Sequence, residues 1–235
     1  MLVAAAVCPC PPLLVPEVAR GAAHEMDDAR AACYDAIAVL AAARPDRLHV
    51  VGAADPSGRG RHPQGAVGSF APFGVGLEVR LGPGGPADRP LPPSLAVGAW
   101  LLERTGWGAA PVEGLAVEES LPGERCAAEG RELAEGAGRV ALLVMGDGTN
   151  CRTEKAPGHL DERAAPFDAA AARALERADT EALLALDEGT ARELGACGRA
   201  GWQVLAGAAE GAGLKGRLLY DRAPYGVGYL VASWS

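Results

Sequence analysis

The sequence lacks several features that would place it in a specialised class of proteins. None of its apolar runs approaches the roughly 20 residues that a membrane-spanning helix needs, so no membrane partner is predicted. The N-terminal stretch carries no positively charged segment, and no signal peptide is expected. Lysine is scarce, with only Lys155 and Lys215, and the formal net charge is -8. Because phosphates bind to basic surfaces, this charge argues against a nucleic-acid partner.

A cysteine pair with the C-x-x-C spacing of many metal and redox sites is also lacking. The six cysteines include no C-x-x-C pair, and a chain of 235 residues can form a core without disulfides. Reduced thiols in a cytoplasmic protein are therefore expected. The composition, 49% hydrophobic and 22% charged, is that of an ordinary globular protein. We predict one domain spanning residues 1–235.

Strand-like and helix-like segments alternate along the first 145 residues. Strands are predicted at 2–8, 47–53, 75–81, 112–117 and 139–145, and helices at 17–43, 94–104 and 124–135. Helices at 162–177, 180–186 and 190–209 and strands at 214–220 and 227–233 follow, with Ser94 and Thr190 as expected N-caps. This alternation favours an α/β fold with a mixed, mostly parallel central sheet and helices on both faces.

The stretch from 142 to 168 is the best single candidate for a functional site. A buried apolar run ends at Gly146, and the polar segment Asp147-Gly148-Thr149-Asn150 follows it. In open α/β sheets, ligands sit beyond the carboxyl ends of the strands. Asp147 suits such a site, although a carboxylate after a strand equally often accepts hydrogen bonds from the following turn. The basic residues of the next loop suit an anionic ligand or simple solvation; they are Arg152, Lys155 and Arg163.

Other chemically active side chains have simpler structural interpretations. Cys8 and Cys10 lie on a proline-rich loop, where packing as small apolar side chains is favoured over metal binding. The basic, glycine-rich segment 55–62 has neither a G-x-G-x-x-G pattern nor a P-loop lysine, so a solvated loop is at least as plausible as an anion site. His49 lies within a predicted strand and is interpreted as a hydrogen-bonded structural residue.

Four segments of the chain, taken in order, resemble the motifs of one family. These segments are Cys10 to Glu17, Gly146 to Asn150, Ala156 to Asp161 with the later pair Phe167-Asp168, and Tyr225 to Ala232. They resemble H-P-P-x-L-V-P-E, G-D-L-S-H, A-P-x-G-Y-D…F-D and F-G-V-G-Y-x-V-A of the LigB-type class III extradiol ring-cleavage dioxygenases. That superfamily also contains the Memo-like proteins. The matches extend over the whole chain.

The resemblance implies an α/β fold and Fe(II) held by two histidines and one carboxylate, with open positions for O₂ and a catechol. It also implies a histidine that acts as acid and base during ring opening. The four corresponding positions carry other residues here: Cys10, the neighbourhood of Ala54 and Asp55, Asn150, and Arg222 beside Asp221. Asparagine does not exchange a proton near neutral pH, and arginine stays protonated.

Two hypotheses follow from these substitutions. In the first, the chain is an enzyme with a rebuilt site, in which zinc or iron is held by residues drawn from Cys10, Asp55, His62, Asp147 and Asp221. Asp147 and Asn150 then occupy the catalytic position, and the substrate pocket includes Thr149, Arg152 and Tyr225. In the second, the metal has been lost, and the chain is a non-catalytic relative that binds a small molecule or a partner. For ring-cleaving chemistry specifically, the second hypothesis, that of a non-catalytic relative, is favoured. A homodimer is expected by analogy alone.

Overall fold

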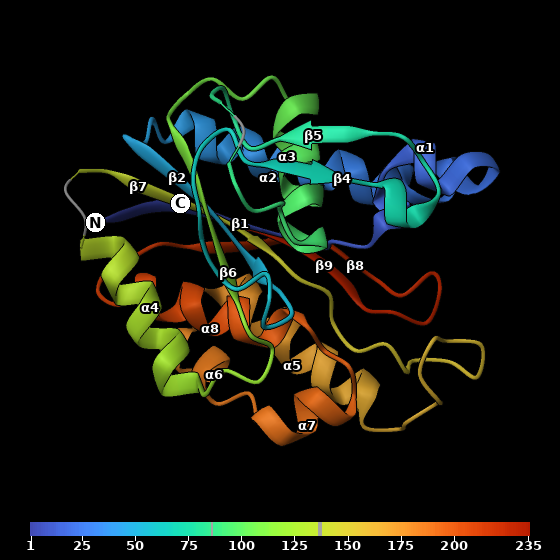
Figure 1. Cartoon of the computed structure of the whole chain (residues 1–235). Coiled ribbons are helices and arrows are strands. Elements are labelled where there is room, and N and C mark those ends of the chain that lie inside the picture. Colours follow the sequence, from blue (N-terminus) through green and yellow to red (C-terminus); the bar gives the residue numbers. More distant parts are fainter. Residues whose placement is uncertain (86, 136–137) are drawn as a thin grey trace.

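A seven-stranded sheet in the order β3-β6-β2-β7-β1-β9-β8 forms the centre of the fold (Figure 1). The computed structural model describes residues 1–85, 87–135 and 138–235. The four inner strands run parallel, and they are β6 (Val112–Val117), β2 (Arg47–Ala53), β7 (Val140–Met145) and β1 (Leu2–Cys8). The antiparallel additions are β3 (Gly60–His62), β9 (Tyr229–Trp234) and β8 (Gly216–Arg222). The predicted mixed, mostly parallel sheet is confirmed.

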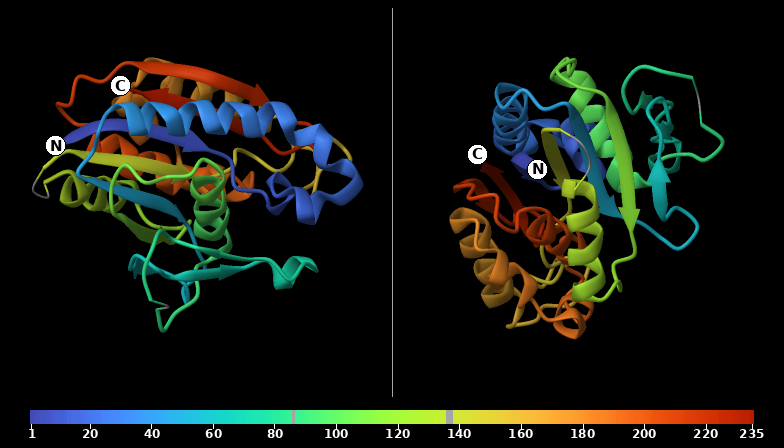
Figure 2. Two further views of the ribbon diagram at one scale, coloured as in Figure 1. Left: turned by 90° about the horizontal axis from the view of Figure 1, so that it is seen from above. Right: turned by 90° about the vertical axis from the view of Figure 1, so that its left-hand side faces the viewer.

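Helices cover both faces of this sheet (Figure 2). The first face carries α2 (Asp27–Ala42) and α3 (Pro93–Arg104); the second carries α4 (Gly123–Glu135), α5 (Ala164–Arg177), α6 (Thr180–Leu184), α7 (Glu188–Glu193) and α8 (Gly198–Ala208). Because successive strand side chains point to opposite faces, β7 supplies both cores. Leu142 and Val144 pack against the second set of helices, whereas Leu143 and Met145 pack against the first.

Two of the predicted helices are interrupted. The region 17–43 forms the short helix α1 (Pro16–Ala19) and a 3-10 segment (Arg20–Met26) before α2 begins. The buried stripe starts only at Met26, and Arg20 has a φ of 52°, which an α-helix does not permit. The region 190–209 divides into α7 and α8 around Gly195, whose φ is 64°. This second break places Cys197 at the N-cap of α8.

The predicted caps Ser94 and Thr190 are wrong. Ser94 lies inside the first turn of α3, and its hydroxyl donates to the carbonyl oxygen of Ala53 (2.6 Å), which ties this helix to the end of β2. Asp187 caps α7 instead, because its carboxylate accepts a hydrogen bond from the backbone N–H of Thr190 (2.8 Å). An aspartate three residues upstream is as good a cap as a threonine, so composition alone did not separate them.

Short strands between residues 60 and 80 differ most from the prediction. The segment 55–62 is not a loop throughout, since β3 pairs with β6 at the edge of the sheet. A separate ribbon is formed by β4 (Val67–Ser69) and β5 (Glu78–Arg80), with a 3-10 turn at Ala71–Phe73 between them. Strands of three residues are too short to show an alternating pattern. No helix among the described residues is long and apolar enough to cross a membrane.

His49 is buried in β2, and its burial gives a testable pH dependence. Its Nδ1 atom lies 3.9 Å from a carboxylate oxygen of Glu113, yet burial lowers the pKa of the imidazole to about 4. Between about pH 6.5 and pH 4 the unfolded chain therefore binds a proton that the folded protein does not. We expect this difference in proton binding at His49 to lower the free energy of unfolding by roughly 3 kcal/mol as the pH drops through that range.

Urea unfolding at pH 7 and pH 4.5 measures this effect. His49→Gln should lose clearly less stability between the two pH values than the unmodified protein, because glutamine does not titrate. His159→Gln, at an exposed loop position, serves as the control. Equal acid sensitivity of the His49→Gln variant and the unmodified protein would contradict the assignment.

Candidate functional site

The candidate site begins where two parallel strands end side by side. Cys8 of β1 is paired with Met145 of β7, so Cys10 and Asp147 each lie two residues beyond a strand end. The backbone N–H of Gly146 donates to the carbonyl oxygen of Cys8 (3.0 Å). The N–H of Cys10 donates to the carboxylate of Asp147 (2.7 Å). Asp147 is therefore fixed against the proline-rich loop that carries Cys10.

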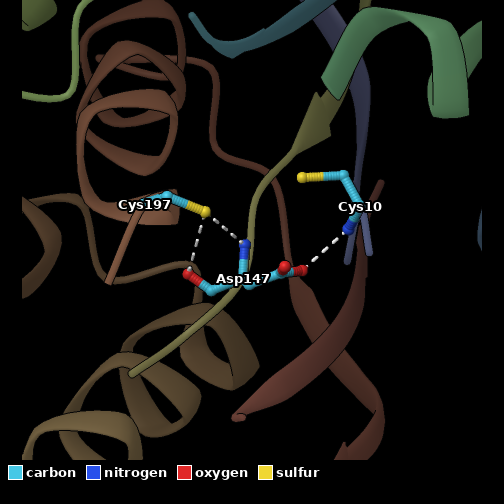
Figure 3. A group of neighbouring side chains, drawn as sticks. All are labelled: Cys10, Asp147 and Cys197. Carbon is cyan, nitrogen blue, oxygen red and sulfur yellow. Dashed lines mark hydrogen bonds between the residues drawn. The ribbon is translucent and has the colours of Figure 1, made fainter. Parts of the chain in front are cut away.

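The N-terminus of α8 brings a third side chain to Asp147 (Figure 3). The N–H of Gly198 donates to the carbonyl oxygen of Asp147 (2.8 Å), and the N–H of Asp147 lies 3.3 Å from the sulfur of Cys197. A Cβ atom on Gly146 would overlap the Cα of Gly198. Paired glycines thus allow α8 to approach the end of β7, and this approach positions Cys197.

Cys10, Asp147 and Cys197 form a three-residue cluster with metal-ligand geometry. Their two sulfur atoms and one carboxylate oxygen lie within 4.8 Å of one another, and all three side chains are partly buried. Two sulfurs and one oxygen suit zinc or iron, and three protein ligands leave a coordination position open for water or a substrate. The chemistry of this donor set fits a soft divalent cation.

The protonation of the cluster is coupled to the binding of any cation there. Burial raises the pKa of Asp147 to about 7, although the hydrogen bond from the Cys10 N–H opposes the shift. The pKa of the Cys10 thiol is raised well above its usual value by its hydrogen bond with Cys197, by burial and by the charge of Asp147. Negative charge is therefore disfavoured at this place unless a positive charge joins it. Binding of a divalent cation would release the protons that these groups hold.

A cavity of about 300 Å³ is lined by residues next to the cluster in the sequence, although not by the cluster itself. It opens at the carboxyl ends of β2 and β6, and Ala196 in its wall precedes Cys197. Its charged lining residues are Asp55, Glu118, Glu119 and Arg192. The charge of Glu119, in the cavity wall, is also among the causes that raise the pKa of Cys10. A small ligand in this cavity would lie at the edge where α/β folds hold their ligands.

The other predicted metal ligands are not brought to Cys10. His62 is buried on β3, where its Nε2 atom lies 2.8 Å from the carbonyl oxygen of Gly58. Asp221 is exposed on β8, and these two strands are the opposite edges of the sheet. Asp55 is exposed in the cavity wall and outside the cluster. Of the predicted ligands, the structure brings Cys10 and Asp147 together and leaves His62, Asp221 and Asp55 outside the cluster.

Thr149 and Arg152, predicted as substrate-pocket residues, hold the loop together instead. Asp168 is 1% exposed and accepts hydrogen bonds from the Thr149 N–H (2.8 Å), the Thr149 hydroxyl (2.9 Å) and the Arg152 guanidinium (2.9 Å). Thr149 is fully buried, so its hydroxyl does not face a ligand. Sequence reasoning did not assign this role to Asp168, although the Phe-Asp pair of the third segment contains it.

Asn150 and Tyr225 also have structural contacts. The side-chain amide of Asn150 lies against Gly158 and Gly195, where an added Cβ atom would collide with it. The Tyr225 hydroxyl donates to Glu25 (2.9 Å) near the surface. Asn150 is thus adjacent to Gly195, where the interruption between α7 and α8 precedes Cys197. Tyr225 instead forms part of the contact between the turn before β9 and the 3-10 segment Arg20–Met26.

The fold and its site describe an α/β protein with a cysteine- and carboxylate-lined centre at the carboxyl edge of its sheet. No protein-family model matches the sequence, and no curated protein matches it. Among solved structures, the crystal structure of an uncharacterized protein, JW3007 from Escherichia coli K12, is similar with a TM-score of 0.54. The alignment covers 99% of each chain at 14% sequence identity, and it shows that the two proteins share a fold.

Proposed function

We propose that this chain binds one soft divalent cation, zinc in the first place, through Cys10, Asp147 and Cys197, and presents it to a small-molecule ligand. The observation that carries the proposal is the approach of three ligand atoms to within 4.8 Å of one another at the carboxyl edge of the sheet. The centre is a rebuilt version of the metal site of LigB-type class III extradiol dioxygenases. A cytoplasmic location, where thiols stay reduced, belongs to the same proposal.

Contacts among the four resembling segments support this relationship. The first segment touches the second through the hydrogen bond from the Cys10 N–H to Asp147. The last segment touches the second through the N–H of Gly148, which donates to Gly228 (2.7 Å), and the N–H of Gly228, which donates to Thr149 (2.8 Å). Asp168 of the third segment completes the group. Segments that are far apart in the sequence therefore converge on one loop, as expected of motifs that build a common site.

The substitutions at the site favour binding or Lewis-acid chemistry over ring cleavage by O₂. When bound, zinc would supply a Lewis acid with an open coordination position. Asp147 is oriented by the N–H of Cys10, and Cys197 is positioned by the N-terminus of α8. Asn150 stands where the family resemblance implies a proton-transferring histidine, and its amide does not move protons near neutral pH. We therefore do not extend the proposal to iron-dependent catechol cleavage.

A metal-free binding protein is the second candidate. The observation that favours it is the set of hydrogen bonds that Asp147 already makes with the backbone of Cys10 and Gly198. The Cys10 N–H donates to the carboxylate and the Gly198 N–H donates to the backbone carbonyl oxygen of Asp147, and an aspartate held in this way after a strand is a common structural device. In this case the cavity beside Glu119 would bind its ligand without a cation.

Metal analysis separates the two candidates. We expect protein purified anaerobically without a metal-affinity tag, with Zn(II) and Fe(II) supplied, to contain close to one metal ion per chain. Cys10→Ala and Cys197→Ala should each weaken binding by at least about 100-fold, since even the loss of a group that only orients a ligand costs about 10–100-fold. Cys126→Ala, at a buried cysteine outside the cluster, should bind normally. A folded protein without metal would overturn the first candidate and leave the second.

A further inference from the structure

We propose that Cys10 and Cys197 form an oxidation site, at which an oxidant of the hydroperoxide class joins the two thiols in a disulfide. The disulfide removes two of the three cluster ligands, so oxidation and metal binding exclude each other. The second statement rests on the proposed metal site, whereas the first concerns the thiols alone and is tested without metal.

Accessibility selects these two thiols among the six. Four cysteines are buried, namely Cys8, Cys33, Cys126 and Cys151, and only Cys10 and Cys197 are partly exposed. The same two side chains extend toward each other on either side of Asp147 (Figure 3). Oxidation depends on solvent access as well as on thiolate character, and access separates the pair Cys10 and Cys197 from the buried neighbours Cys8 and Cys33.

The geometry leaves a short distance to be closed. The two sulfur atoms lie within 4.8 Å, and a disulfide bond is about 2.05 Å long, so they must approach by no more than about 2.8 Å. Cys10 stands between Pro9 and Pro11, which restrict the chain on its side. Cys197 follows the break at Gly195, where φ is 64°. Rotation of the Cys197 side chain, assisted by this break, is the movement that the proposal requires.

The chemical steps balance with one hydroperoxide. The first thiol attacks the peroxide, takes up one oxygen atom as a sulfenic acid and releases an alcohol, or water when the oxidant is hydrogen peroxide. The second thiol then attacks the sulfenic sulfur, which forms the sulfur–sulfur bond and releases water. Two electrons pass from the two sulfurs to the peroxide. Neither sulfur of the product is a thiolate, and the thiolate is the form that binds metals.

Hydrogen peroxide treatment of the 235-residue chain tests the proposal. Metal-free protein is oxidised in steps, denatured, and analysed by thiol counting and by peptide mapping. The expected product has lost two of its six thiols and yields a peptide pair that links Cys10 to Cys197. Cys10→Ser and Cys197→Ser should each fail to form it. The Cys33→Ala variant, which lacks the buried neighbour of Cys8, should form the Cys10–Cys197 disulfide at the normal rate.

The outcomes of this experiment are distinct. A link between Cys8 and Cys33, irreversible oxidation of Cys10 or Cys197 without a link, or no reaction would each overturn the proposal. In zinc-loaded protein, a colorimetric chelator should detect about one zinc ion released per disulfide formed. If the disulfide forms but the reduced protein never binds zinc, the proposed metal function fails while the oxidation site stands. If zinc binds and stays bound after the disulfide has formed, the proposal that oxidation and metal binding exclude each other is wrong.

Discussion

Replacement of Asp168 by alanine is expected to lower the free energy of unfolding by about 3–5 kcal/mol, because it leaves two buried donors of Thr149 unsatisfied, at about 1–3 kcal/mol each, and removes the counter-charge of the partly exposed Arg152. The carboxylate is 1% exposed and accepts two hydrogen bonds from Thr149 and one from Arg152. Without it, the buried N–H and hydroxyl of Thr149 lose their partner, and the guanidinium of Arg152 loses its counter-charge. Chemical denaturation at neutral pH measures the change.

Two further variants separate the causes of this loss. Asp168→Asn retains an oxygen that can accept from the Thr149 N–H but removes the negative charge beside Arg152, so an intermediate loss is expected. Asp28→Ala removes an exposed carboxylate that pairs with Arg222 at the surface, and it should change stability little. If Asp168→Ala unfolds at nearly the same denaturant concentration as Asp28→Ala, Asp168 does not hold the loop.

Asp168 also matters for the position of the site. Added Cβ atoms on Gly148 and Gly228 would collide with its carboxylate, so the loop after β7 and the turn before β9 both close around it. The loop carries Asp147 immediately before Gly148. Loss of Asp168 is therefore expected to weaken metal binding as well as stability, although Asp168 lies outside the metal cluster.

The inner strands of the sheet were predictable because they are long and buried on both faces. Continuous apolar runs mark β1 and β7, β2 is apolar apart from Arg47 and His49, and the prediction placed the ends of all three within one residue. The predicted strand at 75–81 contains β5, whereas β4, with three residues, gave no such signal. Tertiary contacts rather than local sequence pattern determine these short strands.

The candidate site was only half predictable for a related reason. Cys10 and Asp147 follow strand ends, and parallel strands bring such positions to one edge, so local pattern was enough to propose them. Cys197 was assigned to the interior of one long helix, because the apolar spacing on either side of Gly195 is helical. Its contact with Asp147 joins residues 50 positions apart in the chain. The hydrophobic spacing of the sequence does not predict that Cys197 lies next to Asp147. The glycines at 195 and 198 were the visible sign that the helix is interrupted and closely packed there.

The close approach of α8 to β7 leads to the prediction that couples the fold most directly to the site. Gly146→Ala should weaken metal binding by roughly 10–100-fold, the range seen when groups that orient metal ligands are removed. The added methyl group would overlap the Cα of Gly198, and backbone atoms do not yield as a flexible side chain does. The N-terminus of α8 must then move away, and Cys197 moves with it.

The remainder of α8 is held in place, which confines this movement to the end that carries Cys197. An added Cβ on Gly207 would overlap the backbone of Ala127, so α8 also packs closely against α4 at its other end. We therefore expect Gly146→Ala to remain folded, with a stability loss of about 1–3 kcal/mol from overpacking. Zinc titration of folded protein measures the affinity. Gly76→Ala, where an added Cβ meets nothing within 4 Å, is the matched control. Unchanged zinc affinity in the Gly146→Ala variant would contradict the assignment of Cys197 as a ligand that the Gly146–Gly198 contact positions.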